Sequence, residues 1–279
     1  MGLKEIIIIL LVVFVAFGIY FSKTLQREYK KELERGLVNT ISNSRETIEE
    51  EDIENLPNPV QKYLRYVGVL GKEKVKNFRI EIDGQMKMDR NKDFQDAKIE
   101  QYTFQDDLTR LFYMEMKVGG LPIKGLHAYK DGEAIMDIRA LGIIPVAKGQ
   151  GEKMNEAETV TIFNDMCIFA PAALIDKRIK WEEIDDKKVK AYFTNGDITI
   201  QAMLYFNEEG QLINFTSDNR YYSPKGDSFD NLRWSTPITE YDNFNGYNLP
   251  SYGEAYWSFP DEDFTYIKLN IKKINYNVK

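Results

Sequence analysis

The chain has 279 residues, a single cysteine and a formal net charge of −7 at pH 7. Nucleic-acid binding requires a basic face, so this acidic balance argues against a nucleic-acid partner and, outside residues 23–35, against tight adhesion to anionic lipid headgroups. The acidity is sufficiently explained by the need to keep a domain soluble, and one cysteine excludes an internal disulfide without identifying the cell compartment.

An uncharged run of sixteen residues, Ile6 to Phe21, lies close to the N-terminus. As a helix it spans roughly 24 Å, which suits a hydrocarbon core of about 30 Å if the bilayer thins locally and the flanking Lys4 and Lys23 snorkel. It does not end in the small residues of a secretory cleavage site, and no cysteine lies near it to carry a lipid. We therefore predict a retained transmembrane anchor over residues 1–22 of a single-pass cell-membrane protein.

Two arguments on the orientation of this anchor disagree. Five basic residues follow the run within residues 23–35, and the positive-inside rule places the domain behind them in the cytosol. Acidic residues are interspersed among them, and a large domain behind a short N-terminal tail can be translocated regardless of this bias. We expect an extracytoplasmic domain, although the positive charges argue the other way.

The next segment is expected to connect the anchor to the domain. Leu25, Tyr29 and Leu33 recur every four residues, which predicts a helical stalk that Gly36 ends. The chain then becomes polar and reaches the acidic run Glu49-Glu50-Glu51-Asp52, whose like charges repel and predict a solvated tether. A calcium loop is the alternative, but the run lacks alternating oxygen ligands and a turn glycine.

A helix opens the globular domain in the stretch LPNPVQKYLRYVGV. Asn58 can cap it, Pro59 suits its first position, and Gly68 is placed to end it. One apolar stripe follows from the helical spacing, made of Leu56, Val60, Leu64 and Val67. The stripe must be covered by something large.

Most of the remaining chain alternates between apolar and polar residues. This period-two pattern occurs at residues 78–88, 198–206 and 267–271, and it predicts antiparallel strands with one dry and one wet face. Hairpin signals separate strand-like runs at Asp131-Gly132, Asn195-Gly196 and Glu209-Gly210. One clear helix interrupts the strands at about Asn155 to Phe169, where Pro171 follows as a helix breaker. Its apolar stripe comprises Met154, Ala157, Val160, Phe163, Cys167 and Ala170.

These elements predict a β-rich (α+β) fold, in which a strongly curved antiparallel sheet or open half-barrel of about ten strands wraps round one to three helices. The predicted organisation has three parts. They are the anchor at residues 1–22, the helical stalk and acidic tether at residues 23–54, and a single β-rich domain at residues 55–279.

Four separated motifs carry a resemblance to a known family: LPNPVQKYLRYVGV, LGIIPVAKGQGEKMNEAE, FAPAAL followed by IKWEEIDDKKVKAYF, and STPITEYDNFNGYNLPSYGEAYW. Over about residues 55 to 278 the chain resembles an uncharacterised bacterial family, a domain of unknown function whose members often carry an N-terminal membrane segment. The family has no established activity, so the resemblance implies kinship and supplies no chemistry.

A second, weaker resemblance lies in LYFNEEGQLINFTSDNR and the following ITEYDNFNGYNLP, with Tyr241, Gly246 and Pro250 in a turn. These stretches are similar to the C-terminal half of periplasmic lipoprotein carriers. That resemblance implies an open β half-barrel whose concave face is apolar, plugged by helices and able to hold acyl chains.

Catalytic interpretations find little support. A nucleophilic pair would have to join Cys167 to His127, the only histidine, but Cys167 lies on a buried-looking stripe and His127 is expected on a strand surface. The GDSFD stretch at Gly226 to Asp230 lacks a downstream histidine, and GQGEK at Gly149 to Lys153 lacks the spacing of a phosphate loop. We predict no catalytic residue, no metal site and no cofactor.

The large residues in the family-like motifs suggest where a ligand could lie. In one interpretation the tryptophans close the ends of a barrel core and Arg220 pairs with a carboxylate, and in the other the aromatic residues line a cavity and Arg220 meets an anionic headgroup. The ligand-cavity candidates are Phe163, Cys167, Trp181, Arg220, Trp234, Tyr241 and Trp257.

The preferred functional hypothesis is a membrane-anchored, non-enzymatic domain that binds a lipid-like or other apolar ligand in a concave sheet. The alternative is a structural or protein-interaction module with a filled core and no ligand. An enzyme is the third possibility and would require a polar cleft with clustered titratable groups. The sequence identifies no protein partner.

Overall fold

The computed structural model describes residues 2, 4–6, 9, 20–40 and 46–279. The predicted anchor from Ile6 to Phe21 lies almost entirely outside the described residues, so it stays a prediction. Within the described part of the chain, no helix combines the length and the apolar character needed to cross a membrane.

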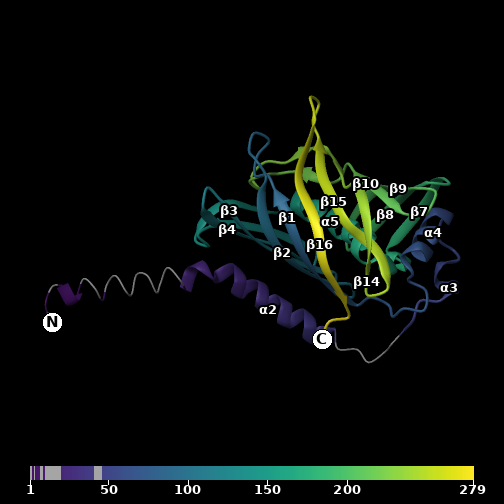
Figure 1. The fold of residues 1–279 in the computed structure, drawn as a ribbon, viewed down its shortest axis with the longest axis horizontal. Coiled ribbons are helices and arrows are strands. Elements are labelled where there is room, and N and C mark those ends of the chain that lie inside the picture. Colours follow the sequence, from purple (N-terminus) through teal and green to yellow (C-terminus); the bar gives the residue numbers. More distant parts are fainter. Residues whose placement is uncertain (1, 3, 7–8, 10–19, 41–45) are drawn as a thin grey trace.

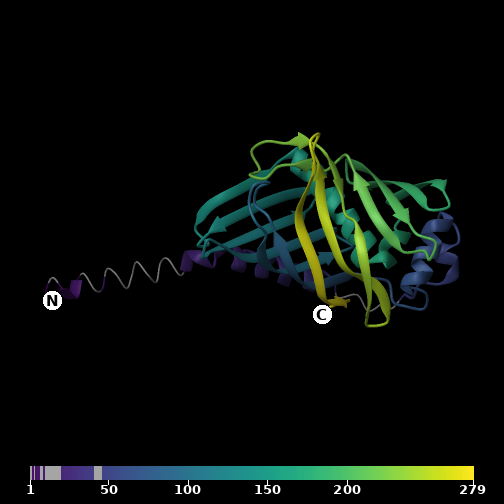
Figure 2. The ribbon, with the colours of Figure 1, turned by 45° about the horizontal axis from the view of Figure 1, so that its top comes forward.

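One strongly curved sheet of fourteen strands dominates the described chain, and every pairing within it is antiparallel (Figure 1 and Figure 2). Its strands are β1 (Asn77–Met86), β2 (Gln95–Phe104), β3 (Thr109–Val118), β4 (Leu121–Lys130), β5 (Glu133–Ala140), β6 (Ile144–Gln150), β7 (Ile179–Asp185), β8 (Lys188–Asn195), β9 (Ile198–Phe206), β10 (Leu212–Ser217), β13 (Arg233–Ser235), β14 (Ile238–Phe244), β15 (Tyr247–Ser258) and β16 (Asp263–Tyr276). A separate two-stranded sheet joins β11 (Tyr221–Tyr222) to β12 (Asp230–Asn231).

The strand order is β6-β5-β4-β3-β2-β1-β16-β15-β13-β10-β9-β8-β7, with β14 paired to β15 beside this path. The predicted curved antiparallel sheet is thus confirmed, but it has fourteen strands instead of about ten. Strands that the sequence pattern did not predict are short or largely exposed to solvent. β13 has three residues and β14 is mostly exposed, so neither carries an alternating apolar pattern.

The predicted hairpin turns all lie between neighbouring antiparallel strands. Asp131-Gly132 joins β4 to β5, the turn after Asn195 joins β8 to β9, and the turn at Glu209-Gly210 joins β9 to β10. Asp131 and Gly132 both have positive φ, which is the backbone geometry that tight hairpin turns of this kind require. In β1 and β9 every second residue is largely buried, as the period-two pattern predicts.

Bulges help the sheet to curve. The register shifts at Glu81/Ile82 in the pair of β1 and β16, and again at Ala255/Tyr256 in the pair of β15 and β16. An extra residue in one strand bends it and increases its twist. Both bulges lie in the middle of the sheet, where the β1–β6 meander meets the C-terminal strands.

Helix α5 (Glu152–Phe169) connects β6 to β7, the two edge strands of the sheet, and crosses its concave side (Figure 2). Every residue from Ala157 to Phe169 is buried, including the polar ones. The predicted single apolar stripe therefore describes only one side of the helix, because the sheet surrounds it on the others. A short 3-10 helix, η1 (Pro171–Ile175), follows directly.

Helix α4 (Asn58–Val67) packs its apolar stripe into the same core and ends at Gly68, whose φ of 82° is the left-handed geometry typical of a helix C-terminus. Its N-cap residue is Pro57 rather than Asn58. The backbone amide of Asn58 donates instead to Glu183 Oε2 at 2.9 Å.

Helix α2 (Thr24–Asn39) lies against the convex face of the sheet (Figure 1). Leu25 and Tyr29 are buried in a second apolar cluster with side chains of β2, β3 and β4, and Tyr29 Oη donates to Glu100 Oε1 at 2.6 Å. Gly36 does not end this helix, which continues to Asn39. A Cβ at Gly36 would collide with the ring of Phe104, so glycine allows the close approach of helix and sheet.

The acidic run forms a short helix, α3 (Glu50–Ile53), instead of a solvated tether. The Asp52 carboxylate accepts a hydrogen bond from the Glu49 amide at 2.9 Å, and carboxylates in the first turn complement the helix dipole. Ile48 and Ile53 are fully buried in the main core. Two apolar residues therefore hold in place a segment whose charges alone predict an extended chain.

Candidate functional site

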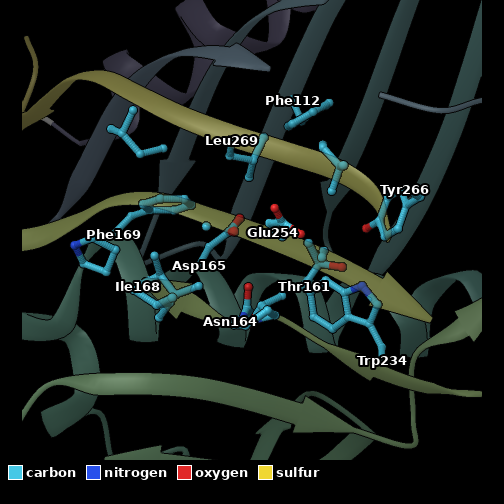
Figure 3. A pocket seen from close by; sticks show the side chains of 18 of the residues that line it. Phe112, Thr161, Asn164, Asp165, Ile168, Phe169, Trp234, Glu254, Tyr266 and Leu269 are labelled. Atoms are coloured by element: carbon cyan, nitrogen blue, oxygen red, sulfur yellow. The ribbon is translucent and has the colours of Figure 1, made fainter. Parts of the chain in front are cut away.

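Two cavities lie between α5 and the concave face of the sheet, each of about 120 Å³. The apolar part of the first wall includes Ile168 and Phe169 of α5 and Leu269 of β16 (Figure 3). The second is rich in methionine and contains Met86, Met88, Met114, Met136 and Met154. Both walls include Met86, His127, Glu158, Arg220 and Tyr266. The cavities are therefore neighbours, and their shared wall carries titratable groups.

Helix α5 presents two different faces to its surroundings. Glu158, Thr161, Asp165 and Ile168 follow one another at intervals of three and four residues, and all four line the first cavity. Phe163 lies on the other side, where its ring is 5.2 Å from that of Phe193 in a stacked arrangement. One face thus builds the aromatic core against β8, and the other face supplies the polar groups of the cavity.

A buried ionic cluster joins α5 to the inner face of β2 and β3. Arg110 is only 6% exposed, and its Nε donates to Asp165 Oδ2 at 2.6 Å while Nη1 donates to Glu158 Oε2 at 3.2 Å. Its Nη2 donates to Gln101 Oε1 at 3.0 Å, and Gln101 Nε2 donates to Asp165 Oδ2 at 2.8 Å. A buried guanidinium is tolerated when its donors are satisfied in this way.

The second oxygen of Glu158 faces two further groups at longer distances. Arg220 Nη2 lies 3.7 Å and His127 Nδ1 lies 3.8 Å from Glu158 Oε1, and both distances exceed those of hydrogen bonds. Arg220 Nε donates to Thr161 Oγ1 at 2.9 Å. Arg220 therefore has one close hydrogen bond from Nε, and its terminal nitrogens are only loosely associated with Glu158.

The pKa values of Glu158 and Asp165 are shifted in opposite directions. Burial by itself raises the pKa of Glu158, but the interactions with His127, Arg110 and Arg220 outweigh it and lower the pKa to about 2. Burial raises the pKa of Asp165, helped by repulsion from Glu158 and opposed by Arg110 and Gln101. Glu158 is therefore the firmly ionised member of the pair at neutral pH.

Two tryptophans flank Arg220. The guanidinium carbon lies 5.0 Å from the ring centre of Trp234 and 5.4 Å from that of Trp257, which is the range of cation–π contacts. The buried Trp234 Nε1 has no hydrogen-bond partner among the described residues. Figure 3 shows Trp234 on the wall of the first cavity beside Thr161. A buried N–H without an acceptor is unfavourable, so this donor marks a place where an acceptor would be stabilising.

The sequence-predicted candidates separate into two groups. Arg220 and Trp234 line the first cavity, and Arg220 and Trp257 line the second. Phe163, Cys167, Trp181 and Tyr241 are not among the residues that line either cavity. Their environments are those of packing residues: Phe163 and Cys167 are fully buried, Trp181 lies beside Phe163 with ring centres 6.3 Å apart, and Tyr241 Oη donates to the Leu212 carbonyl at 2.8 Å.

The cluster contains residues that the sequence reasoning missed. Arg110, Glu158 and Asp165 were not candidates, and His127, expected on a strand surface, has a side chain only 21% exposed that lines both cavities. Glu158 and Asp165 are seven residues apart on a helix expected to be buried, which places two carboxylates on one inner face. That spacing was the available signal. Nothing in the sequence pairs them with Arg110.

Comparison with solved structures finds matches of low sequence identity that cover most of the chain. No curated protein matches the chain. A LolA superfamily protein from Nitrosomonas europaea shares 9% identity over 79% of this chain and 93% of its own, with a TM-score of 0.42. A DUF1329 family protein from Desulfovibrio piger shares 9% over 79% and 92%, with a TM-score of 0.41. A domain assigned as outer membrane lipoprotein-sorting from Vibrio parahaemolyticus shares 8% over 72% and 86%, with a TM-score of 0.40.

The weaker resemblance predicted from the sequence was to this class of lipoprotein carriers, but TM-scores below 0.5 support no statement about a ligand. The family assignment is firmer. Residues 46–269 match the model of a family of unknown function, DUF6544, over most of the chain, which confirms the predicted kinship with an uncharacterised family. The chain belongs to the DUF6544 family.

Proposed function

We propose that the domain binds a lipid-like, amphipathic ligand whose apolar part enters the two cavities and whose polar group meets Arg220 and Trp234. The observation that carries this proposal is the pair of mainly apolar cavities that share Arg220 in their common wall. Concave apolar sites with a few convergent polar groups are typical of small-molecule binding.

The cavity size and lining restrict the ligand. Each cavity is about 120 Å³, comparable to an apolar cavity of about 150 Å³ that holds a benzene-sized molecule. A long chain therefore needs the walls to adapt. Methionine side chains are unbranched and flexible, and the five methionines of the second cavity are suited to such adaptation.

The polar end of the ligand is inferred from donors without close acceptors. Trp234 Nε1 has no partner among the described residues, and the Arg220 terminal nitrogen nearest to Glu158 is 3.7 Å from its carboxylate oxygen. A carboxylate or a similar oxygen acceptor would satisfy both. The cavity walls do carry the clustered titratable groups that an enzyme would require, but Arg110, Glu158 and Asp165 are bonded to one another, and this arrangement suits a binding role better than catalysis.

The experiment uses residues 20–279, purified and tested by lipid extraction, native mass spectrometry and titration with a medium-chain fatty acid and its methyl ester. We expect tighter binding of the acid than of the ester. Trp234→Phe, which keeps the ring and removes the N–H, is expected to weaken acid binding about tenfold. Trp181→Phe is the matched control, since Trp181 lines neither cavity.

A chain that neither co-purifies with an apolar molecule nor binds either probe would contradict the ligand proposal. It would favour the alternative, a structural or protein-interaction module. That alternative has its own support in the structure, because every residue of α5 from Ala157 to Phe169 is buried.

We further propose that residues 1–22 anchor the domain in the cell membrane and that the domain is extracytoplasmic. The support is the uncharged run from Ile6 to Phe21. Cys167 is fully buried, so a cysteine introduced at the exposed Glu133 is a selective probe. Labelling of Glu133→Cys by an impermeant maleimide on intact cells is expected, and labelling only after lysis would place the domain in the cytosol.

A further inference from the structure

We propose that two neighbouring hairpin tips of the domain dock on the lipid bilayer that holds the N-terminal anchor. The tip patch, as we name it, consists of exposed apolar side chains at the end of the β3–β4 hairpin and in the β5–β6 hairpin. Its members are Val118, Leu121, Leu141, Ile143, Ile144 and Val146.

The two tips lie side by side because the strands that carry them are paired. Val118 pairs with Leu121 across the first hairpin, and Ala140 pairs with Ile144 across the second. The Leu141 amide donates to the Pro122 carbonyl at 2.8 Å, which joins one tip to the other. The exposed apolar residues therefore form one surface rather than isolated positions. Contiguous patches of this kind usually mark an interaction site.

The tip patch lies where the chain leaves the predicted membrane span. A Cβ added at Gly142, in the second tip, would collide with the carbonyl of Ser22, so the chain just before α2 is in close contact with this tip. Tyr20 and Phe21, the last residues of the apolar run, are themselves 61% and 40% exposed. Figure 1 shows the ends of β3 and β4 above the N-terminal end of α2, on the side opposite to β7 and α4.

The partner chemistry follows from this position. If residues 1–22 span a bilayer, as proposed above, the tip patch lies at the level where the span ends. The guanidinium carbon of Arg27 lies 4.0 Å from the ring centre of Tyr20. This arrangement suits the membrane interface, where aromatic and basic side chains are enriched. The net charge of −7 favours apolar insertion over attraction to anionic headgroups. The tips therefore meet a lipid surface, which fixes the tilt of the domain on its membrane.

The test measures how deeply the tip patch enters a bilayer. The full chain is reconstituted in phosphatidylcholine vesicles after an environment-sensitive fluorophore is attached to a cysteine at Ile144→Cys, and vesicles with and without doxyl-labelled lipids are compared. Cys167 is fully buried, so the unsubstituted chain serves as the labelling blank. The matched control is Ile184→Cys, because Ile184 is 46% exposed and Ile144 is 56% exposed, and Ile184 lies in β7 at the far end of the sheet (Figure 1).

We expect the emission of the fluorophore at Ile144→Cys to shift to shorter wavelength. We also expect doxyl groups that lie roughly 5–10 Å deep in the bilayer to quench about half of that emission. The fluorophore at Ile184→Cys should show neither change. Leu121→Cys, in the other tip, gives the same readout if Ile144→Cys does not fold. A probe that remains solvent-exposed at both tips in vesicles carrying the chain overturns the docking proposal and leaves the anchor standing. A chain that does not float with the vesicles overturns both, and neither result bears on ligand binding in the cavities.

Discussion

The buried cluster makes one quantitative prediction about folding. Glu158→Gln keeps the size and shape of the side chain but removes the negative charge that Arg110, Arg220 and His127 share. Arg110 keeps Asp165 as a partner, whereas Arg220 loses the nearest carboxylate in the cluster. We expect the variant to fold and to be markedly less stable than the wild type at neutral pH.

The magnitude follows from the pKa of Glu158. Its fall from an ordinary value of 4.5 to about 2 corresponds to about 3 kcal/mol in the free energy of unfolding, at about 1.36 kcal/mol per unit of pKa. Because the pKa is lower in the folded state, this stabilisation is present above pH 4.5 and is lost as the pH falls toward 2. The cost agrees with the range of about 3–5 kcal/mol for breaking a buried ion pair.

The assay is urea unfolding of residues 20–279 followed by tryptophan fluorescence at several pH values. The stability difference between wild type and Glu158→Gln should be about 3 kcal/mol at pH 7 and should shrink as the pH falls below 4.5. Glu133→Gln, at the exposed start of β5, should change stability by less than about 0.5 kcal/mol. A difference at Glu158 that stays constant from pH 7 to pH 3 would refute the charge argument.

Substitutions at two further positions test the packing of the helices. Gly36→Ala should destabilise the fold by about 1–2 kcal/mol, because crowding against Phe104 outweighs the better helix propensity of alanine. Faster proteolysis within α2 would report this loss of stability. Unchanged stability would mean that α2 packs loosely against the sheet. Cys167→Ala should cost about 1–2 kcal/mol and leave ligand binding intact, whereas Cys167→Asp should prevent folding. Burial and the nearby Asp165 raise the pKa of the Cys167 thiol, so maleimide should react with it only after denaturation. Loss of binding in a folded Cys167→Ala protein would contradict the packing role and support a reactive thiol.

Elements whose signals are local in the sequence were predicted correctly. Gly68 ends α4 because only a residue that accepts positive φ suits that position, and Asp131-Gly132 turns β4 into β5 for a related reason. The alternating pattern in β1 and β9 could be recognised in the sequence because one face of each strand is buried and apolar. Fold class, antiparallel pairing and the position of the central helix all follow from such signals.

Signals of this kind fail where neighbouring elements override local preference. The acidic run was predicted to be a solvated tether because like charges repel, yet two buried isoleucines, Ile48 and Ile53, hold it against the core. Gly36 was expected to end a helix, yet it serves as a contact point with Phe104. In both cases the partner is distant in sequence and leaves no trace in the local pattern.

The candidate site depends on contacts between elements that are distant in the sequence. Arg220, Trp234 and Trp257 were predicted from their size and motif context, and the sheet does bring them to the cavity walls. Arg110 meets Asp165 across 55 residues and Glu158 across 48. These pairings depend on the curvature of the sheet around α5, which sets which strand residues face which helix residues. The two-residue period of apolar side chains and the turn residues specify where each strand begins and ends. Only the curvature of the sheet around α5 brings the buried charged side chains close enough to interact.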